Sequence, residues 1–130
     1  MDSRISSDME TQKNREKCRI LLSLSPKIRY VGIINEFGRT LAGQLRKGVI
    51  PLFKVDEARN EFFIEATRNR LRRGFEYSIG KTEYTLTENE KVKILTLSDN
   101  SSFYYFTFDK DTSTQELTRA LEDAKRLIMQ

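Results

Sequence analysis

The residue types that dominate enzyme active sites are scarce in this sequence. It contains no histidine and a single cysteine, Cys18. Cys/His and Ser/His/Asp catalysis and thiolate zinc sites are therefore excluded. A phosphate-binding motif of the form G-x-x-x-x-G-K-[ST] is also missing. Asp109 and Asp111 flank an expected helix start, where acidic residues favour the helix dipole, so we assign them no metal. The sequence predicts a non-enzymatic protein without a cofactor.

The densest charge is an arginine cluster near the end of an expected helix. Residues 68–73 contain Arg68, Arg70, Arg72 and Arg73. Cations near a helix C-terminus complement its dipole and pack their stems along the surface, which is a sufficient structural explanation. The alternative is a binding surface for an acidic protein, or, with less support, for nucleic acid, whose affinity would fall steeply with salt.

A second basic patch is expected in the first third of the chain. The net charge is only +4, with 23 basic and 19 acidic residues, but cations are in excess between residues 27 and 54. The patch consists of Lys27, Arg29, Arg46 and Lys47. It would extend any surface that the arginine cluster forms.

Two apolar features can be explained either by packing in the hydrophobic core or by a function. Cys18 lies on the apolar stripe of the first expected helix, which favours a buried thiol over a reactive one. The aromatic run 103–106 with Phe108 favours strand burial, and its alternative is a ligand pocket or a base-stacking surface.

The elements that position these residues follow from apolar periodicity, turn residues and helix caps. Residues 1–9 are polar and predict a disordered lead-in, and residues 10–130 predict a single domain. Ser113 and Glu116 form a capping box before the clearest helix. The expected helices are 10–24, 56–73 and 113–128, and the expected strands are 28–34, 40–45, 81–87, 91–97 and 102–108.

Strand polarity predicts the order of the sheet. Strands 28–34 and 102–108 have apolar residues in both phases and belong at the centre. Strand 81–87 leaves one phase polar, and strand 40–45 is short with Gly43 and Gln44 inside it, so both belong at the edges. Strand 91–97 changes phase, which indicates either a bulge or burial on both faces. The prediction is an α+β fold: a five-stranded antiparallel sheet of order 2-1-5-4-3, α-β-β-α-β-β-β-α succession, and helices on both faces.

This succession, together with residues 30–43 (YVGIINEFGRTLAG), resembles the roadblock domain of the profilin-like group. The likeness spans residues 10–128, and the chain is also similar to small archaeal proteins of unassigned function. The resemblance implies an adaptor or regulator of small GTPases or motors. It also implies side-by-side pairing through the second helix and the third strand.

That pairing would place the arginine cluster in a dimer interface. Like charges across a two-fold axis repel unless acidic residues face them, and Glu57, Glu61 and Glu65 on the same helix are suitable. Antiparallel pairing of the two helices would bring the opposite charges together. The candidate partner or dimer surface is therefore Arg68, Arg70, Arg72, Arg73, Glu57, Glu61 and Glu65.

The leading functional prediction is a homodimeric regulatory domain that binds a protein, with a small GTPase or signalling component as the candidate. The alternatives are a PAS-like small-molecule sensor, which would need a large pocket between sheet and helices, and a nucleic-acid-binding protein. The N-terminal residues form no apolar signal core, and no apolar stretch is long enough to span a membrane. The expected location is the cytoplasm.

Overall fold

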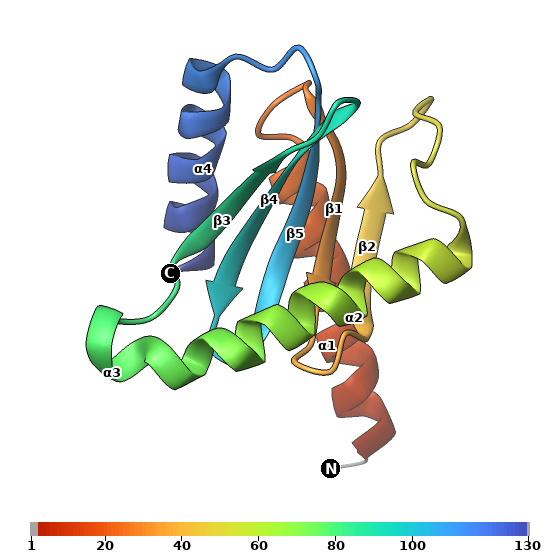
Figure 1. The fold of residues 1–130 in the computed structure, drawn as a ribbon. Coiled ribbons are helices and arrows are strands. Elements are labelled where there is room, and N and C mark those ends of the chain that lie inside the picture. The colour runs from red at the N-terminus through yellow and green to blue at the C-terminus, as the bar shows by residue number, and fades with distance from the viewer. Residues whose placement is uncertain (1–2, 130) are drawn as a thin grey trace.

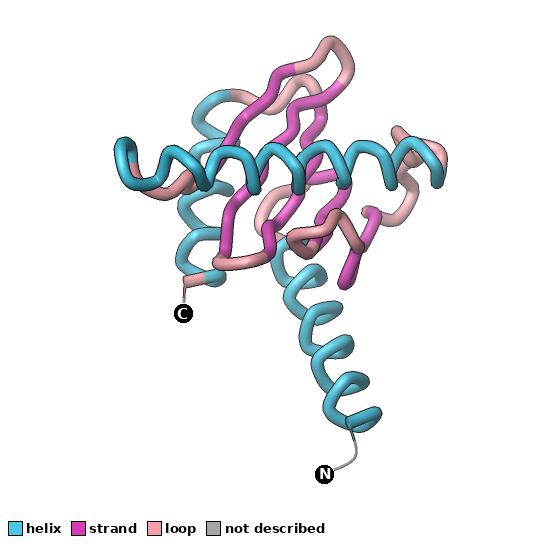
Figure 2. Tube along the Cα trace, turned by 60° about the horizontal axis from the view of Figure 1, so that its bottom comes forward, coloured by secondary structure: helices cyan, strands magenta, loops and turns pink. Residues whose placement is uncertain are grey.

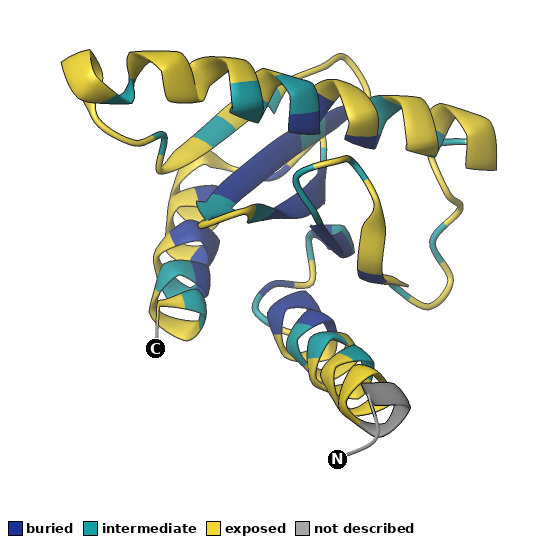
Figure 3. Ribbon diagram, turned by 90° about the horizontal axis from the view of Figure 1, so that it is seen from below, coloured by how far each residue is buried: buried dark blue, intermediate teal, exposed yellow. Residues whose placement is uncertain are grey.

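The computed structural model of the chain describes residues 3–129, which form three layers (Figure 1). Figure 3 shows α2 on one side of the sheet, and α1 and α4 on the other. The helical elements are α1 (Ser3–Leu22), α2 (Val55–Arg72), the 3-10 turn η1 (Arg73–Phe75), α3 (Glu76–Ile79) and α4 (Thr114–Ile128). The strands are β1 (Ile28–Ile34), β2 (Thr40–Leu45), β3 (Tyr84–Glu88), β4 (Val92–Asp99) and β5 (Ser102–Asp109).

The sheet confirms the predicted order, β2-β1-β5-β4-β3, and all of its neighbours are antiparallel. The two strands expected at the centre, β1 and β5, pair with each other. The register of β4 with both neighbours is continuous, and Ile94 and Leu95 are both buried. Burial on both faces, rather than a bulge, therefore explains its change of phase.

The larger core lies between the sheet and the helices α1 and α4. Leu117, Ala120, Leu121 and Ala124 of α4 recur at helical spacing and are all buried. The α4 N-terminus confirms the capping box, because the Ser113 hydroxyl accepts from the Glu116 amide at 3.1 Å and the Glu116 carboxylate accepts from the Ser113 amide at 3.0 Å. This half of the fold follows directly from the sequence pattern.

The smaller core lies beneath α2, which crosses the opposite face of the sheet (Figure 2). Phe62 packs edge-on against Tyr105 with ring centroids 5.0 Å apart, and it stacks on Tyr30 at 6.4 Å. The Tyr30 ring lies over Gly32 and Gly43, where an added Cβ would come within 2.7 and 2.3 Å of its hydroxyl oxygen. The two glycines therefore provide the space that the Tyr30 ring occupies.

Several expected boundaries differ from the structure, most of them by one or two residues and the starts of α1 and β3 by more. Helix α1 already begins at Ser3, so the segment expected to be a disordered lead-in is helical from that residue, and residues 1 and 2 lie outside the described part. Residues 6–10 are exposed, and the segment has no apolar period that would have predicted a helix. Helix α2 begins at Val55, and the chain continues through η1 and α3 as far as Gly80 (φ +83°). Consequently β3 starts at Tyr84 instead of residue 81.

Arg46 connects the end of α1, the turn that follows it and the start of β1 through side-chain hydrogen bonds. Its guanidinium donates to the carbonyl oxygens of Leu22, Ser25 and Ile28 at 2.6, 2.7 and 2.6 Å. The Leu22 carbonyl belongs to the last turn of α1, where helical carbonyls have no partner within the helix. Arg46 thereby fixes the end of α1 to the start of β1. Among the described residues, none of the helices is long and apolar enough to cross a membrane.

Candidate interaction surface

The arginine cluster divides into two pairs with different surroundings. Arg70 donates to the carbonyl oxygen of Glu36 and, at 3.2 Å, to the hydroxyl of Thr67, while Arg73 lies 3.4 Å from the Glu36 carboxylate. Both therefore hold the β1–β2 turn, which is separated from them by more than thirty residues of sequence. Arg68 and Arg72 are exposed, with the Arg72 guanidinium 5.0 Å above the Phe75 ring.

A glycine lets the β1–β2 turn approach α2 closely enough for these bonds. Gly38 has φ +88°, and a Cβ there would meet the Phe63 Cα at 2.8 Å. The Asn35 carboxamide oxygen closes the turn by accepting from the amides of Phe37 and Arg39, both at 2.9 Å. Residues 35–38 were expected to be a turn, but their docking on α2 had no sequence signal.

The acidic half of α2 is partly committed to the domain's own structure. The Glu57 carboxylate accepts from the Lys54 amide at 3.0 Å, and Glu61 accepts from the Tyr105 hydroxyl at 2.7 Å. Glu65 is only 9% exposed. Burial raises the pKa of its carboxyl, the nearby Glu61 charge raises that pKa further, and Arg68 opposes the shift. Burial beneath the helix also raises the pKa of Tyr105.

Five of the seven expected surface residues form one stripe along α2. We call Glu57, Glu61, Glu65, Arg68 and Arg72 the charged stripe; their spacings of four, four, three and four residues place them on one side of a helix. Glu61 reaches Tyr105 of β5, whereas Arg70 reaches the β1–β2 turn from the other side of α2. The charged stripe therefore lies on the side of α2 turned away from the β1–β2 turn, and because α2 crosses the strands, it runs from the β2 side of the sheet towards the β3 side (Figure 1).

Exposed apolar side chains accompany the charged stripe and continue beyond it. Ile64 and Leu71 of α2 are 58% and 69% exposed. Phe75, Tyr77 and Ile79 are exposed at the turn formed by η1 and α3, which extends past the β3 edge in Figure 1. Exposed large apolar groups on neighbouring elements are typical of interaction sites, so these residues join the candidate surface. Sequence periodicity placed Ile64 and Leu71 on a helix without revealing which side lacked a covering, and Phe75, Tyr77 and Ile79 lay outside the expected helix.

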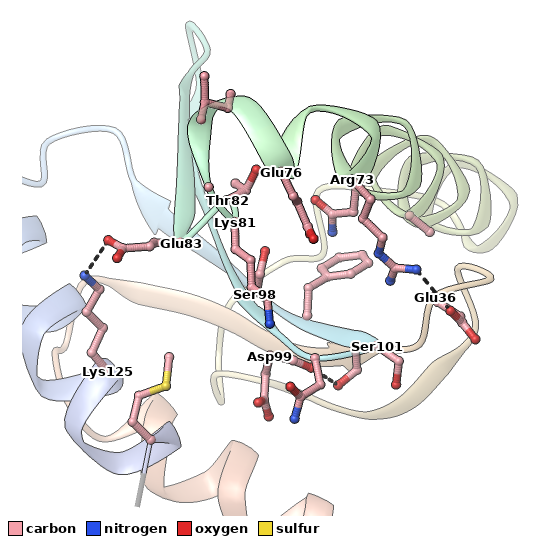
Figure 4. A pocket seen from close by; sticks show the side chains of 18 residues that line it. Glu36, Arg73, Glu76, Lys81, Thr82, Glu83, Ser98, Asp99, Ser101 and Lys125 are labelled. Atoms are coloured by element: carbon pink, nitrogen blue, oxygen red, sulfur yellow. Dashed lines mark hydrogen bonds and ion pairs between the residues drawn. The ribbon is translucent and has the colours of Figure 1, made fainter.

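A polar groove of about 920 Å³ lies between the end of α2 and the β4–β5 turn (Figure 4). Arg73 and Glu76 line it from the helical side, and Ser98 and Asp99 from the end of β4. Its charges are of both signs, and the Glu83 carboxylate lies 3.6 Å from the Lys125 ammonium. Among residues 3–129, no group of three or more Cys, Asp or Glu side chains is arranged to hold a metal ion.

The second basic patch is largely engaged in internal contacts. The Lys27 ammonium lies 2.9 Å from the Asp111 carboxylate, which raises the lysine pKa and lowers that of Asp111. Arg29 pairs with Asp109 at 3.0 Å and donates to the Ile50 carbonyl at 3.1 Å. Arg46 holds the three carbonyls described above. Lys47 is exposed, so the four side chains have separate surroundings.

The apolar candidates lie in the interior. Cys18 is fully buried, and burial raises the pKa of its thiol to about 11. All of Phe103, Tyr104, Tyr105, Phe106 and Phe108 are buried. A separate, smaller hollow between α2 and the sheet, lined in part by Tyr30, Phe62 and Tyr105, has a volume of about 120 Å³. That volume is below the 300–1,000 Å³ typical of sites for drug-sized ligands.

Comparison with known proteins places the fold. No protein-family model and no curated protein matches the chain. Among solved structures, MglB in a tetrameric arrangement has a TM-score of 0.72 at 12% identity, over 91% of this chain and 86% of that one. The Roadblock/LC7 domain from Streptomyces avermitilis has a TM-score of 0.59 at 9% identity, over 89% and 98%. Profilin II of Acanthamoeba castellanii has a TM-score of 0.57 at 12% identity, over 89% and 97%. The chain has the roadblock/profilin-like fold.

Proposed function

We propose that this chain is a non-enzymatic regulatory adaptor that homodimerises through α2 and β3 and binds a protein partner, a small GTPase or signalling component. The observation that carries the proposal is the charged stripe beside exposed apolar residues on α2. Its acidic members precede its basic members in the sequence, so a second copy running antiparallel presents the complementary order. The lone, buried cysteine fits the expected cytoplasmic location.

The spacing of the charged stripe defines a register for the pair. Opposing Glu61 with the partner's Arg68 also opposes Glu57 with the partner's Arg72, because both pairs are centred midway between residues 64 and 65. The two-fold axis would then pass beside Ile64, an exposed apolar residue. Exposed ion pairs contribute about 0–1 kcal/mol each, so they select the register while apolar burial supplies most of the affinity.

The β3 edge supports the same arrangement. Strand β3 pairs with β4 on one side only, and Thr85 and Thr87, opposite Thr96 and Ile94 of β4, are half-buried on the face that α2 covers. Tyr84 and Leu86 are 45% and 50% exposed. A second β3 alongside the first would satisfy the edge backbone and join the two sheets. MglB, with the same fold at 12% identity, self-associates in its solved tetrameric arrangement.

Charge reversal in the stripe tests the pairing. We expect Arg68→Glu/Arg72→Glu to convert a dimer to a monomer, because each reversed residue would face an acidic residue of the partner. Sedimentation velocity at micromolar concentration measures the mass. The matched control is Arg15→Glu/Arg119→Glu, which reverses two exposed arginines on α1 and α4. A monomeric parent, or equal masses for both variants, would refute dimerisation through α2.

The partner class has its own test. Purified small GTPases of the same organism, loaded with a fluorescent GDP or with a non-hydrolysable GTP analogue, would be titrated with the protein and followed by fluorescence anisotropy. Binding that differs between the two nucleotide states supports regulation of a GTPase. No binding in either state would remove the GTPase as partner and leave the dimer proposal intact.

A further inference from the structure

Strand β2 forms the other edge of the sheet, and its backbone is available for pairing. It pairs with β1 only. The Arg46 amide donates to the Arg29 carbonyl at 2.8 Å, which fixes the phase of the ladder at this end. Since inward and outward backbone groups alternate along an antiparallel strand, Gly43 and Leu45 direct their N–H and C=O groups away from β1. These outward N–H and C=O groups are the ones with which an additional strand would pair.

Strand β2 contains no charged residue or proline of the kind that usually protects an edge strand, and its only irregularity is a register shift against β1 at the Thr40 end. Natural edges are blunted by charged residues, prolines or a covering element. The six residues of β2, TLAGQL, contain neither charge nor proline. Five of them are exposed, including Leu41 and Leu45 at 41% and 36%, and only Ala42 is buried (Figure 3). An unprotected edge of this kind is a template for an added strand.

Free cations stand at both ends of this edge. Arg39 and Lys47 flank β2, both are exposed, and neither forms an ion pair within residues 3–129. The sequence from residue 37 to residue 55 contains no acidic residue at all. A strand laid along β2 would therefore find positive charge at each of its ends, which favours acidic residues there.

The same charges argue against a second copy of this chain as the occupant. An antiparallel β2 pair centred on the strand would place Arg39 opposite Arg46 and leave no acidic residue nearby. Opposed like charges cost free energy in cross-strand pairs. The charge pattern thus selects a foreign segment over self-pairing.

A polar group is also placed for recognition at the middle of the strand. The Tyr30 hydroxyl lies over Gly43, and it has no hydrogen-bond partner among the described residues. The hydroxyl can donate to, or accept from, a polar side chain of an incoming strand.

We propose that β2 is a docking edge where an extended segment of another protein, with acidic residues at both ends, adds as a sixth strand. The leucines beside it receive the segment's apolar side chains, and Arg39 and Lys47 receive its acidic ends. This surface lies at the opposite edge from β3. The proposal therefore stands whether or not α2 mediates dimerisation.

A displayed library of random twelve-residue peptides, panned against the whole protein, supplies the probe. We expect enriched peptides to carry acidic residues at both ends of a β-prone stretch. Their affinity should fall about tenfold or more for Leu45→Pro, which removes an outward N–H but no bond to β1. Leu45→Thr keeps that N–H and is the matched control. Urea unfolding verifies that both variants fold.

Two further measurements do not depend on the proline variant. In the parent protein, an enriched peptide should slow amide hydrogen exchange at Gly43 and Leu45 and leave β3 unchanged. Arg39→Glu/Lys47→Glu should weaken binding about tenfold or more, with the loss reduced at high salt. Enrichment of neutral or basic peptides, no enrichment, or protection elsewhere would overturn the proposal. So would sedimentation data in which Leu45→Pro abolishes self-association instead of peptide binding.

Discussion

Arg46 was expected on a basic surface patch, yet it holds three backbone carbonyl oxygens at 2.6 to 2.7 Å. We expect Arg46→Ala to lower the free energy of unfolding by about 2 to 4 kcal/mol, because hydrogen bonds to a charged donor are strong and the carbonyls are left without it. Urea denaturation measures the change. Lys47→Ala, at the neighbouring exposed position, should lie within about 0.5 kcal/mol of the parent.

The ionisation of Glu65 makes the free energy of unfolding depend on pH in a definite direction. Burial first, and the Glu61 charge second, raise the folded-state pKa above the ordinary value of 4.5, and Arg68 opposes them. The folded state therefore binds the proton more tightly than the unfolded state does. The contribution of Glu65 to stability is fully present below about pH 4.5 and is lost as the pH rises through the folded-state pKa.

We therefore expect Glu65→Gln to be more stable than the parent at pH 7, with the difference shrinking as the pH falls through the folded-state pKa and disappearing below about pH 4.5. Urea unfolding of both proteins across this range measures the difference. Glu122→Gln, at an exposed position of α4, controls for the loss of one negative charge. A difference that is constant with pH would show that the Glu65 carboxyl titrates normally.

The roles of individual arginines illustrate what sequence pattern leaves open. Helical spacing places Glu57, Glu61 and Arg68 on one side of α2, so the charged stripe was accessible from sequence. The engagement of Arg70 and Arg73 with Glu36 was not, because it depends on the β1–β2 turn meeting α2 through Gly38. Contacts between segments so distant in sequence leave no local periodicity.

At the scale of elements, the polarity pattern of the strands predicted their order in the sheet correctly. The residue pattern of the helices did not predict where those helices begin and end. The order β2-β1-β5-β4-β3 followed because a strand covered on both faces needs apolar residues in both phases. The start of α1 did not follow, because its first residues are mostly polar and carry no apolar period, and residues 6–10 are exposed. The sequence also did not predict that the chain continues from α2 into η1 and α3. Gly74 permits a turn at that point but does not require one.

Helix α4 gives the sharpest test of an element. Leu121 is 8% exposed within the larger core, and Leu127, two turns later, is 38% exposed. We expect Leu121→Asp to lower the free energy of unfolding by several kcal/mol, roughly 3 or more, because it places an unpaired charge among apolar side chains. Leu127→Asp on the same helix should cost much less. Thermal unfolding followed by circular dichroism compares them, and equal melting temperatures would refute this placement of α4.

At the scale of the molecule, the two edges of the sheet differ in what they offer a partner. Along α2, charges of both signs are arranged so that a second copy complements them. In the segments that flank β2 in the sequence, the exposed charged residues are the cations Arg39 and Lys47. The first pattern suits self-association and the second suits a foreign, acidic segment. One domain would then have one surface for a second copy of itself and another surface for a different protein.

The register proposed for the dimer makes a final prediction about symmetry. A residue beside a two-fold axis lies next to its own copy, so Ile64→Cys should form a disulfide-linked dimer under mild oxidation. Glu57→Cys and Arg72→Cys should each remain monomeric on a denaturing gel when oxidised alone, yet link when the two proteins are mixed. The native Cys18 does not interfere, because it is fully buried and its thiol pKa is about 11. Efficient linking of Arg72→Cys to itself would move the axis towards the end of α2 and contradict the register.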